Sequence, residues 1–143
     1  MSTDIGTGPT PVVLAIQNDQ TDPPLLVGQW LAESGISVQV IEACFGEQVP
    51  AAVPPGVHGV LALGGVMGAG DDGVAPWLVA ERALLADATD RGIPVLGLCL
   101  GAQLLAFEFN EVYLHYSPCI CASMSLSVSV SVLVLVLCVG VRI

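Results

Sequence analysis

Four short apolar runs recur along the first two thirds of the chain and predict buried β-strands. Each is rich in valine, isoleucine or leucine, as expected for strands that helices cover on both faces of a sheet. The runs are residues 12–16, 36–41, 57–63 and 93–98.

Proline and glycine mark the ends of the helical segments between these runs. The predicted helices begin after Asp22-Pro23-Pro24, at Pro76 and at Gly101, and they end at Gly35, Gly92 and Phe107. Because strands alternate with helices, the sequence predicts an α/β fold, a parallel sheet with flanking helices over residues 12–107.

The polarity pattern changes after Phe107. We treat residues 1–11 as a flexible leader and residues 108–143 as an atypical low-complexity tail of serine, valine and leucine. The tail contains no charged residue between 116 and 141, and serine alternates with leucine or valine over 125–132. The sheet therefore ends after four strands, and we expect part of it to be uncovered.

Three interpretations of the tail remain. Its alternation suits a strand, but its length far exceeds the usual 3–10 residues. Its length suits a membrane anchor over residues 117–141, although valine and serine are mediocre helix formers. A frameshifted or truncated end also fits, because a short nucleotide repeat translates into two-letter alternation. The composition favours this third interpretation.

The chain length and the net charge limit the number of domains and the classes of partner that we expect. A chain of 143 residues suits one domain. Three basic residues against thirteen acidic ones give a net charge of −10, with no lysine. We therefore expect no nucleic acid and no anionic membrane surface as a partner, since both need a basic patch.

The cysteines suggest a reducing compartment. Their number, five, is odd, and Met1 to Thr10 does not resemble a secretory signal, so we expect a cytoplasmic protein. Cys119-x-Cys121 has no second cysteine pair, and His58 and His115 are the only histidines. We therefore expect neither a metal site nor a cofactor.

Candidate chemistry centres on Gly97-Leu98-Cys99-Leu100-Gly101, a G-x-C-x-G pattern between a predicted strand and a predicted helix. In a nucleophile elbow, a sharp turn between glycines projects the side chain above the strand end. The helix N-terminus favours a thiolate at Cys99, and the backbone N–H of Leu100 is placed for an oxyanion. The structural alternative is a buried, inert cysteine.

The longer string Gly92 to Ala106 closely resembles the nucleophile segment of class I glutamine amidotransferases. Residues 63–69, Asp71-Asp72 and Trp77-Leu78 resemble the glycine loop of the free-standing, GMP-synthase-like members. The resemblance covers about residues 12–106, only the N-terminal part of the family's domain. It implies a flavodoxin-like three-layer sheet that is incomplete at the C-terminus.

The resemblance also implies a reaction. Cys99 would attack the side-chain amide of glutamine, release ammonia and leave a thioester for water to hydrolyse. Leu100 and a backbone N–H near Gly65 or Val66 would form the oxyanion hole. Gly64 and Gln103 would lie beside the glutamine, although Gln103 is equally well explained as an exposed helix residue. The acceptor of the ammonia would lie on another domain or subunit.

Three acidic residues have mainly structural interpretations. Glu81 lies on the apolar stripe of the second predicted helix, so it is either a buried anchor or the solvated edge of that stripe. We favour the anchor. Asp71 and Asp72 are expected to be loop acids or to mark a helix start, with substrate binding as the minor alternative.

The general base is missing. The resemblance implies a His-x-Glu pair well downstream of the cysteine, whereas His115 has no acid two residues later and His58 precedes the third predicted strand. We therefore expect this chain, as it stands, to be catalytically impaired or inactive. An inactive pseudoenzyme, a membrane-tethered binding module and a cysteine-elbow α/β-hydrolase remain alternatives.

Overall fold

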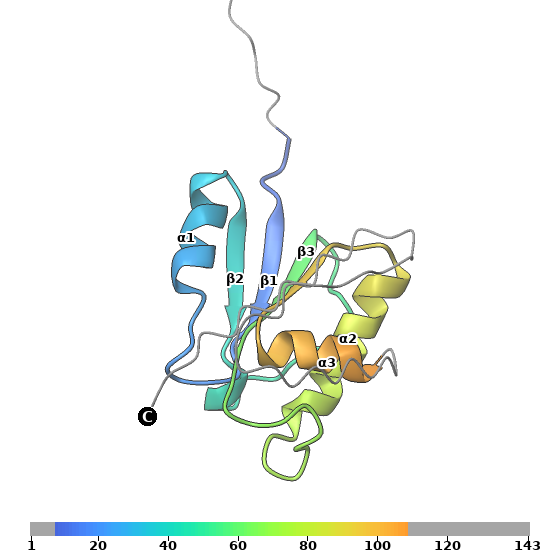
Figure 1. The fold of residues 1–143 in the computed structure, drawn as a ribbon. Helices are drawn as coiled ribbons and strands as arrows, with labels where there is room; N and C mark the ends of the chain where they lie inside the picture. Colours follow the sequence, from blue (N-terminus) through green and yellow to red (C-terminus); the bar gives the residue numbers. More distant parts are fainter. Residues whose placement is uncertain (1–7, 109–143) are drawn as a thin grey trace, which may run out of the picture.

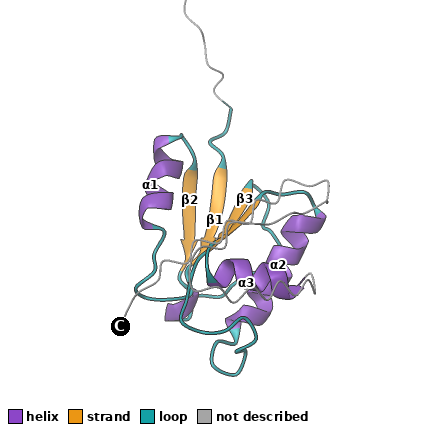
Figure 2. Cartoon of the chain, viewed as in Figure 1, coloured by secondary structure: helices purple, strands orange, loops and turns teal. Residues whose placement is uncertain are grey.

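A computed structural model of the protein describes residues 8–108, which form a parallel sheet flanked by helices (Figures 1 and 2). The strands are β1 (Val12–Ile16), β2 (Ser37–Ile41), β3 (Gly59–Ala62) and β4 (Val95–Gly97), in the order β2-β1-β3-β4. The helices are α1 (Leu25–Glu33), α2 (Trp77–Asp90) and α3 (Leu100–Glu108), with a 3₁₀ turn at Ala43–Phe45. The predicted α/β fold is confirmed.

The register brings the carboxyl ends of all four strands to one level. Ile16 of β1 lies opposite Ile41 of β2 and Ala62 of β3, and Ala62 lies opposite Gly97 of β4. The residues that follow these strands therefore meet at one edge of the sheet. This is the edge at which open α/β sheets bind their ligands.

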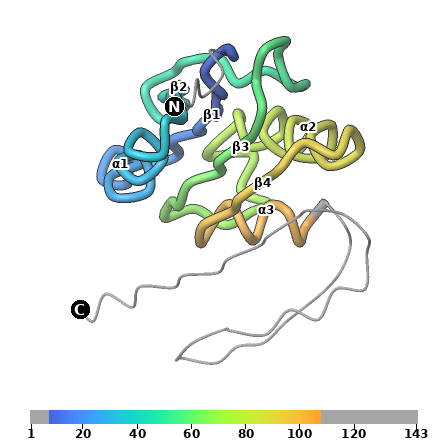
Figure 3. Tube along the Cα trace, turned by 90° about the horizontal axis from the view of Figure 1, so that it is seen from above, coloured from blue at the N-terminus to red at the C-terminus, as the bar shows by residue number. Residues whose placement is uncertain are grey.

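The two faces of the sheet carry different helices, and α1 and α2 lie on opposite sides of it (Figure 3). The larger core joins alternate residues of β1, β3 and β4 to α2 and α3, with Leu84 and Leu104 fully buried. On the other face, Leu61 and Ala15 pack with Val27 and Leu31 of α1.

Helix α1 covers only part of its face. Beside it lies a groove of about 340 Å³, lined by apolar sheet residues such as Val13, Leu61 and Leu96 and bordered by Leu31 and His58. This agrees with the expectation that part of the sheet is uncovered within residues 8–108.

Most of the sequence-predicted helix ends agree with the structure. Gly35 and Gly92 adopt positive φ, 75° and 67°, just beyond α1 and α2. The apolar stripe of α2 expected from the sequence is buried at Leu78, Glu81, Leu84, Leu85 and Ala88, whereas its first member, Trp77, is half-buried. Within α1, the apolar residues Leu25, Leu26 and Trp30 are more than half exposed.

Several predictions concern residues outside the described range. These are residues 1–7 of the leader, residues 109–143 of the tail with the suggested membrane segment over 117–141, and His115, so they stay predictions; Glu108, the first residue of the predicted tail, ends α3. Within residues 8–108, no helix has the length and apolar character needed to cross a membrane.

Two glycines allow α3 to pack directly on the sheet. A Cβ atom on Gly101 would lie 2.1 Å from the carbonyl oxygen of Ala62 in β3. A Cβ atom on Gly97 would lie 2.7 Å from the backbone of the first turn of α3. Real Cβ atoms do not approach backbone this closely, so any side chain at either position forces the strand and the helix apart.

We expect Gly101→Ala to lower the free energy of unfolding by about 3 kcal/mol, because the overpacking outweighs the better helix propensity of alanine. Gly73→Ala is the matched control, since its Cβ would meet nothing within 4 Å. Chemical denaturation of the two variants measures the difference. Equal stabilities would show that α3 does not rest on β3 as described.

Candidate functional site

Cys99 lies at the junction between β4 and α3. Only Leu98 and Cys99 separate the two elements. Its φ is +51°, and it is the one non-glycine residue with positive φ among residues 8–108. Such a conformation costs on the order of 1–3 kcal/mol and is concentrated at functional turns. The half-buried side chain lies at the carboxyl edge of the sheet, where a nucleophile would be placed.

The glycine loop after β3 lies against this junction. A Cβ atom on Gly64 would lie 3.6 Å from the Cβ of Cys99, and one on Gly65 would lie 2.8 Å from the Leu100 side chain. The structure therefore brings together Cys99, Leu100, Gly64 and Gly65 at the carboxyl edge of the sheet. The side chain of Val66 points into solvent, with 90% of it exposed.

Gln103 lies in the first turn of α3 with its side chain exposed. Its backbone N–H donates to the carbonyl of Cys99 at 3.1 Å, which closes the turn that carries the cysteine. Both sequence interpretations of Gln103, a ligand contact and an exposed helix residue, are compatible with this place.

A buried polar network supports the glycine loop from behind. The Asn18 side-chain amide donates to the carbonyl of Leu63 at 3.3 Å and to Glu81 Oε1 at 3.1 Å. The indole N–H of Trp77 donates to Asn18 Oδ1 at 2.8 Å. One asparagine thus joins the ends of β1 and β3 to α2. Because Leu63 directly precedes Gly64, this network fixes the start of the loop.

Glu81 is fully buried, so the anchor interpretation is confirmed and the solvated edge is wrong. Burial raises the pKa of Glu81 to about 8, although the hydrogen bond from Asn18 and the charge of Arg82 oppose the shift. Glu81 Oε2 has no hydrogen-bond partner within the described part of the chain. Both observations favour the neutral carboxyl group at physiological pH.

The far end of the glycine loop is held by charge. The two terminal nitrogens of Arg82, Nη1 and Nη2, donate to the Asp72 carboxylate at 2.8 Å, and Nη1 also donates to the carbonyl of Ala69. The guanidinium lies 5.0 Å from the centre of the Phe107 ring of α3. Asp71 accepts from the Gly68 N–H at 2.7 Å. The predicted loop acids therefore order the loop.

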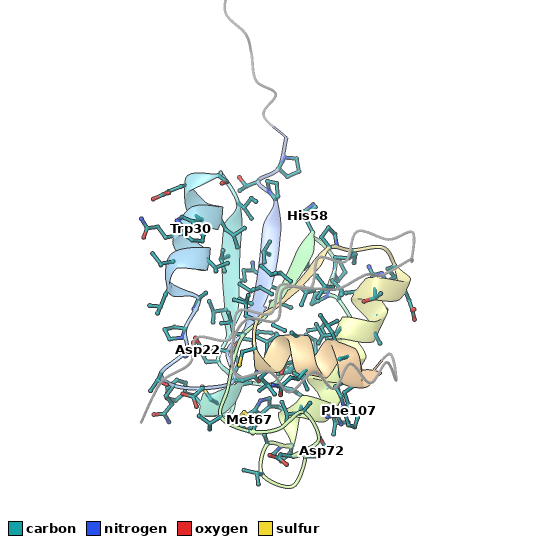
Figure 4. All side chains as sticks on the ribbon, in the orientation of Figure 1. Asp22, Trp30, His58, Met67, Asp72 and Phe107 are labelled. Carbon is teal, nitrogen blue, oxygen red and sulfur yellow. The ribbon has the colours of Figure 1, made fainter. Side chains whose placement is uncertain are left out.

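His58 lies far from Cys99. It precedes β3 at the amino edge of the sheet, where its Nδ1 accepts from the Val12 N–H at 3.2 Å. Figure 4 shows His58 and Asp22 at opposite ends of the strands. As the only histidine within residues 8–108, it supplies no base to the cysteine, which agrees with its interpretation as a strand-end residue.

Two polar residues at this edge were not predicted from the sequence. Asn18 follows β1 at the level where ligand-binding residues collect, but nothing in its sequence neighbourhood shows that it contacts Trp77 or Glu81. Asp22 was expected only to mark the start of a helix, yet its Oδ2 would lie 2.2 Å from a Cβ on Gly64. Across residues 8–108, no cluster of three or more metal-ligating side chains forms.

The raised pKa of Glu81 predicts a pH-dependent stability. The carboxyl group titrates near 4.5 when unfolded and near 8 when folded, so folding takes up a proton between these values. The contribution of Glu81 to the free energy of unfolding is fully present below pH 4.5 and is lost as the pH rises towards 8. We expect Glu81→Gln, which keeps the acceptor for Asn18, to remove this decline. Chemical denaturation of the native chain and of Glu81→Gln at pH 5 and pH 8 measures the change in the free energy of unfolding.

Asp90→Asn is the control for this experiment, because Asp90 is exposed at the end of the same helix. It should retain the decline seen in the native chain. If the stability of the native chain and of Glu81→Gln changed in parallel with pH, Glu81 would be ionised in the folded protein.

Comparison with known proteins bears on the fold of the chain. No protein-family model matches the chain, and no curated protein sequence matches it. Among solved structures, a glutamine amidotransferase from Thermotoga maritima is 30% identical, with a TM-score of 0.62, over 69% of this chain and 43% of that one. A glutamine amido transferase from Methylobacillus flagellatus is 36% identical, with a TM-score of 0.61, over 69% and 38%.

A third solved structure, of SMU.1228c, is 22% identical with a TM-score of 0.63 and covers 68% of this chain and 43% of that one, so it bears on the fold alone. The chain spans less than half the length of each of these proteins. Strand order, helix placement and these matches agree with the resemblance seen in the sequence. Residues 8–108 therefore have a class I glutamine amidotransferase-like fold.

Proposed function

We propose that the chain carries the nucleophile half of a glutamine amidotransferase site, in which Cys99 attacks the side-chain amide of glutamine. The sulfur bonds to the amide carbon, the carbon–nitrogen bond breaks, and the amide nitrogen leaves as ammonia with the proton of the thiol. Water then cleaves the γ-glutamyl thioester, which gives glutamate and restores the thiol.

The observation that carries this proposal is the left-handed Cys99 between β4 and α3. A strained non-glycine residue persists only where the surrounding packing holds it, and here the close approach of Gly101 to β3 does so. The glycine loop then lies beside the sulfur-bearing side chain. A cysteine that served only as a small core residue would need neither feature.

Backbone N–H groups would stabilise the oxyanion of the attacked amide. Leu100 begins α3, so its N–H belongs to the positive end of the helix. The loop around Gly65 and Val66 packs against Leu100 and supplies the second donor. Gly64 and Gln103 would contact the remainder of the glutamine.

Turnover should be slow. Proton transfer by a positioned base contributes roughly 10²–10⁴-fold to reactions of this class. Within residues 8–108 the one histidine lies at the wrong edge, and no His-x-Glu occurs in the 143 residues. The N-terminus of α3 then assists ionisation of the thiol. The chain therefore acts as an impaired glutaminase.

The released ammonia requires an acceptor, which we place on another domain or subunit. Glutamine is the small-molecule substrate, and neither a cofactor nor a nucleic acid takes part. The cysteine content and acidic charge favour the cytoplasm as the location.

Chemical rescue tests the proposal. We expect added imidazole to raise glutamate release from glutamine at least about tenfold, because it replaces the missing base. Cys99→Ala should abolish both the basal and the rescued activity. Cys44→Ala is the matched control: Cys44 is also half-buried, and burial raises the pKa of its thiol, so its removal should leave both rates unchanged.

Glutamate release by Cys99→Ala at the native rate would overturn the assignment of the nucleophile. Activity that depends on Cys99 but ignores imidazole would show that a base is already present. Coupled enzymatic detection of glutamate provides the readout in each case.

A further inference from the structure

The carboxylate of Asp22 lies beside Cys99, and the proposed reaction does not use this carboxylate. Asp22 belongs to the loop between β1 and α1, and its Oδ2 packs so closely on Gly64 that a Cβ there would lie 2.2 Å from it. The Cβ of Cys99 lies 3.6 Å from the same point. Asp22, Gly64 and Cys99 thus face one small volume at the carboxyl edge of the sheet.

Within residues 8–108, no cation forms an ion pair with this carboxylate. The structure shows no hydrogen bond or ion pair to the Asp22 side chain from any residue between 8 and 108, although that side chain is half-buried. The chain has no lysine, Arg82 binds Asp72, and Arg91 binds Asp87. A half-buried carboxylate stabilises a cation that reaches it, and here that cation must come from outside the described fold.

The loop holds Asp22 in place. The Asp22 backbone N–H donates to the carbonyl of Asp19 at 3.2 Å, and Asp19 Oδ1 accepts from both the N–H and the hydroxyl of Thr21. Pro23 and Pro24 follow, which restricts the backbone on the other side. The carboxylate is therefore presented by a stiff turn, as a recognition group should be.

We propose that Asp22 is a specificity residue that binds the α-ammonium group of the amino-acid substrate while Cys99 attacks its side-chain amide. This rests on the proposed function and deepens it. The γ-amide and the ammonium of glutamine are joined by a short chain of single bonds, so one molecule can reach both groups. The Asp22 carboxylate favours the binding of ligands that carry a cation near the reacting group, and it disfavours the binding of anions.

Charge-selective thiol labelling tests the placement of Asp22 without any need for turnover. The probes are aminoethyl methanethiosulfonate, a cation, and sulfonatoethyl methanethiosulfonate, an anion, with peptide mass mapping to follow each cysteine separately. We expect Asp22→Asn to lower the ratio of cationic to anionic labelling rates at Cys99 by about tenfold. Asp22→Glu should restore it.

Two controls isolate the effect. Cys44 in the same molecules should keep its ratio in Asp22→Asn, because Asp22 is not among the charges that act on it. Asp90→Asn removes one exposed charge at the end of α2 and should leave the ratio at Cys99 unchanged. An unchanged ratio at Cys99 in Asp22→Asn would overturn the inference.

Ligand protection then identifies the cation. Glutamine should slow alkylation of Cys99 by neutral iodoacetamide, whereas N-acetylglutamine, which lacks the ammonium group, should protect about tenfold more weakly. In Asp22→Asn the two ligands should protect equally. Equal protection in the native chain would overturn the inference while it supports the proposed function.

The two proposals can fail separately. If neither ligand protects Cys99 and imidazole rescues no glutaminase activity, the proposed function is wrong. The labelling ratio would still decide whether Asp22 controls the charge of what reaches Cys99.

Discussion

The direct contact between α3 and β3 at Gly101 is the constraint on which the site depends. Because this glycine touches the Ala62 carbonyl, the chain must turn from β4 into α3 within two residues. Cys99 accepts a left-handed backbone as a result. Burial of Leu100, Leu104 and Leu105 offsets that strain, since each buried leucine contributes roughly 1.5–3 kcal/mol. The contact between α3 and β3 therefore accounts both for the packing of α3 and for the position of the reactive Cys99.

A second layer of interactions keeps the glycine loop at the right distance. Asn18 satisfies three partners in a dry environment, where each hydrogen bond is stronger than it would be in water. At the other end of the loop, Arg82 binds Asp72, whose side chain is 41% exposed, so water weakens this ion pair. The loop is thus fixed most firmly where it faces Cys99 and less firmly at its tip.

Features that depend on local sequence were predictable. The β-branched runs gave the strands, Gly35 and Gly92 gave two helix ends, and the position of Glu81 on its stripe predicted burial. The partners of Asn18 and Asp22 were not predictable, because they lie more than forty residues away and depend on strand order and register. The exposure of Trp30 also escaped prediction, since an apolar residue on a helix does not reveal whether a neighbour covers it.

The two tryptophans of the chain lie in opposite surroundings. Trp30 is 59% exposed on the outer side of α1 (Figure 4), whereas the indole of Trp77 is hydrogen-bonded to Asn18 beneath the glycine loop. Their fluorescence therefore reports different events: solvent at the surface of α1, and the state of the site. Replacement of Trp30 by phenylalanine would leave Trp77 as the single tryptophan, whose emission wavelength follows the arrangement of the loop beside Cys99.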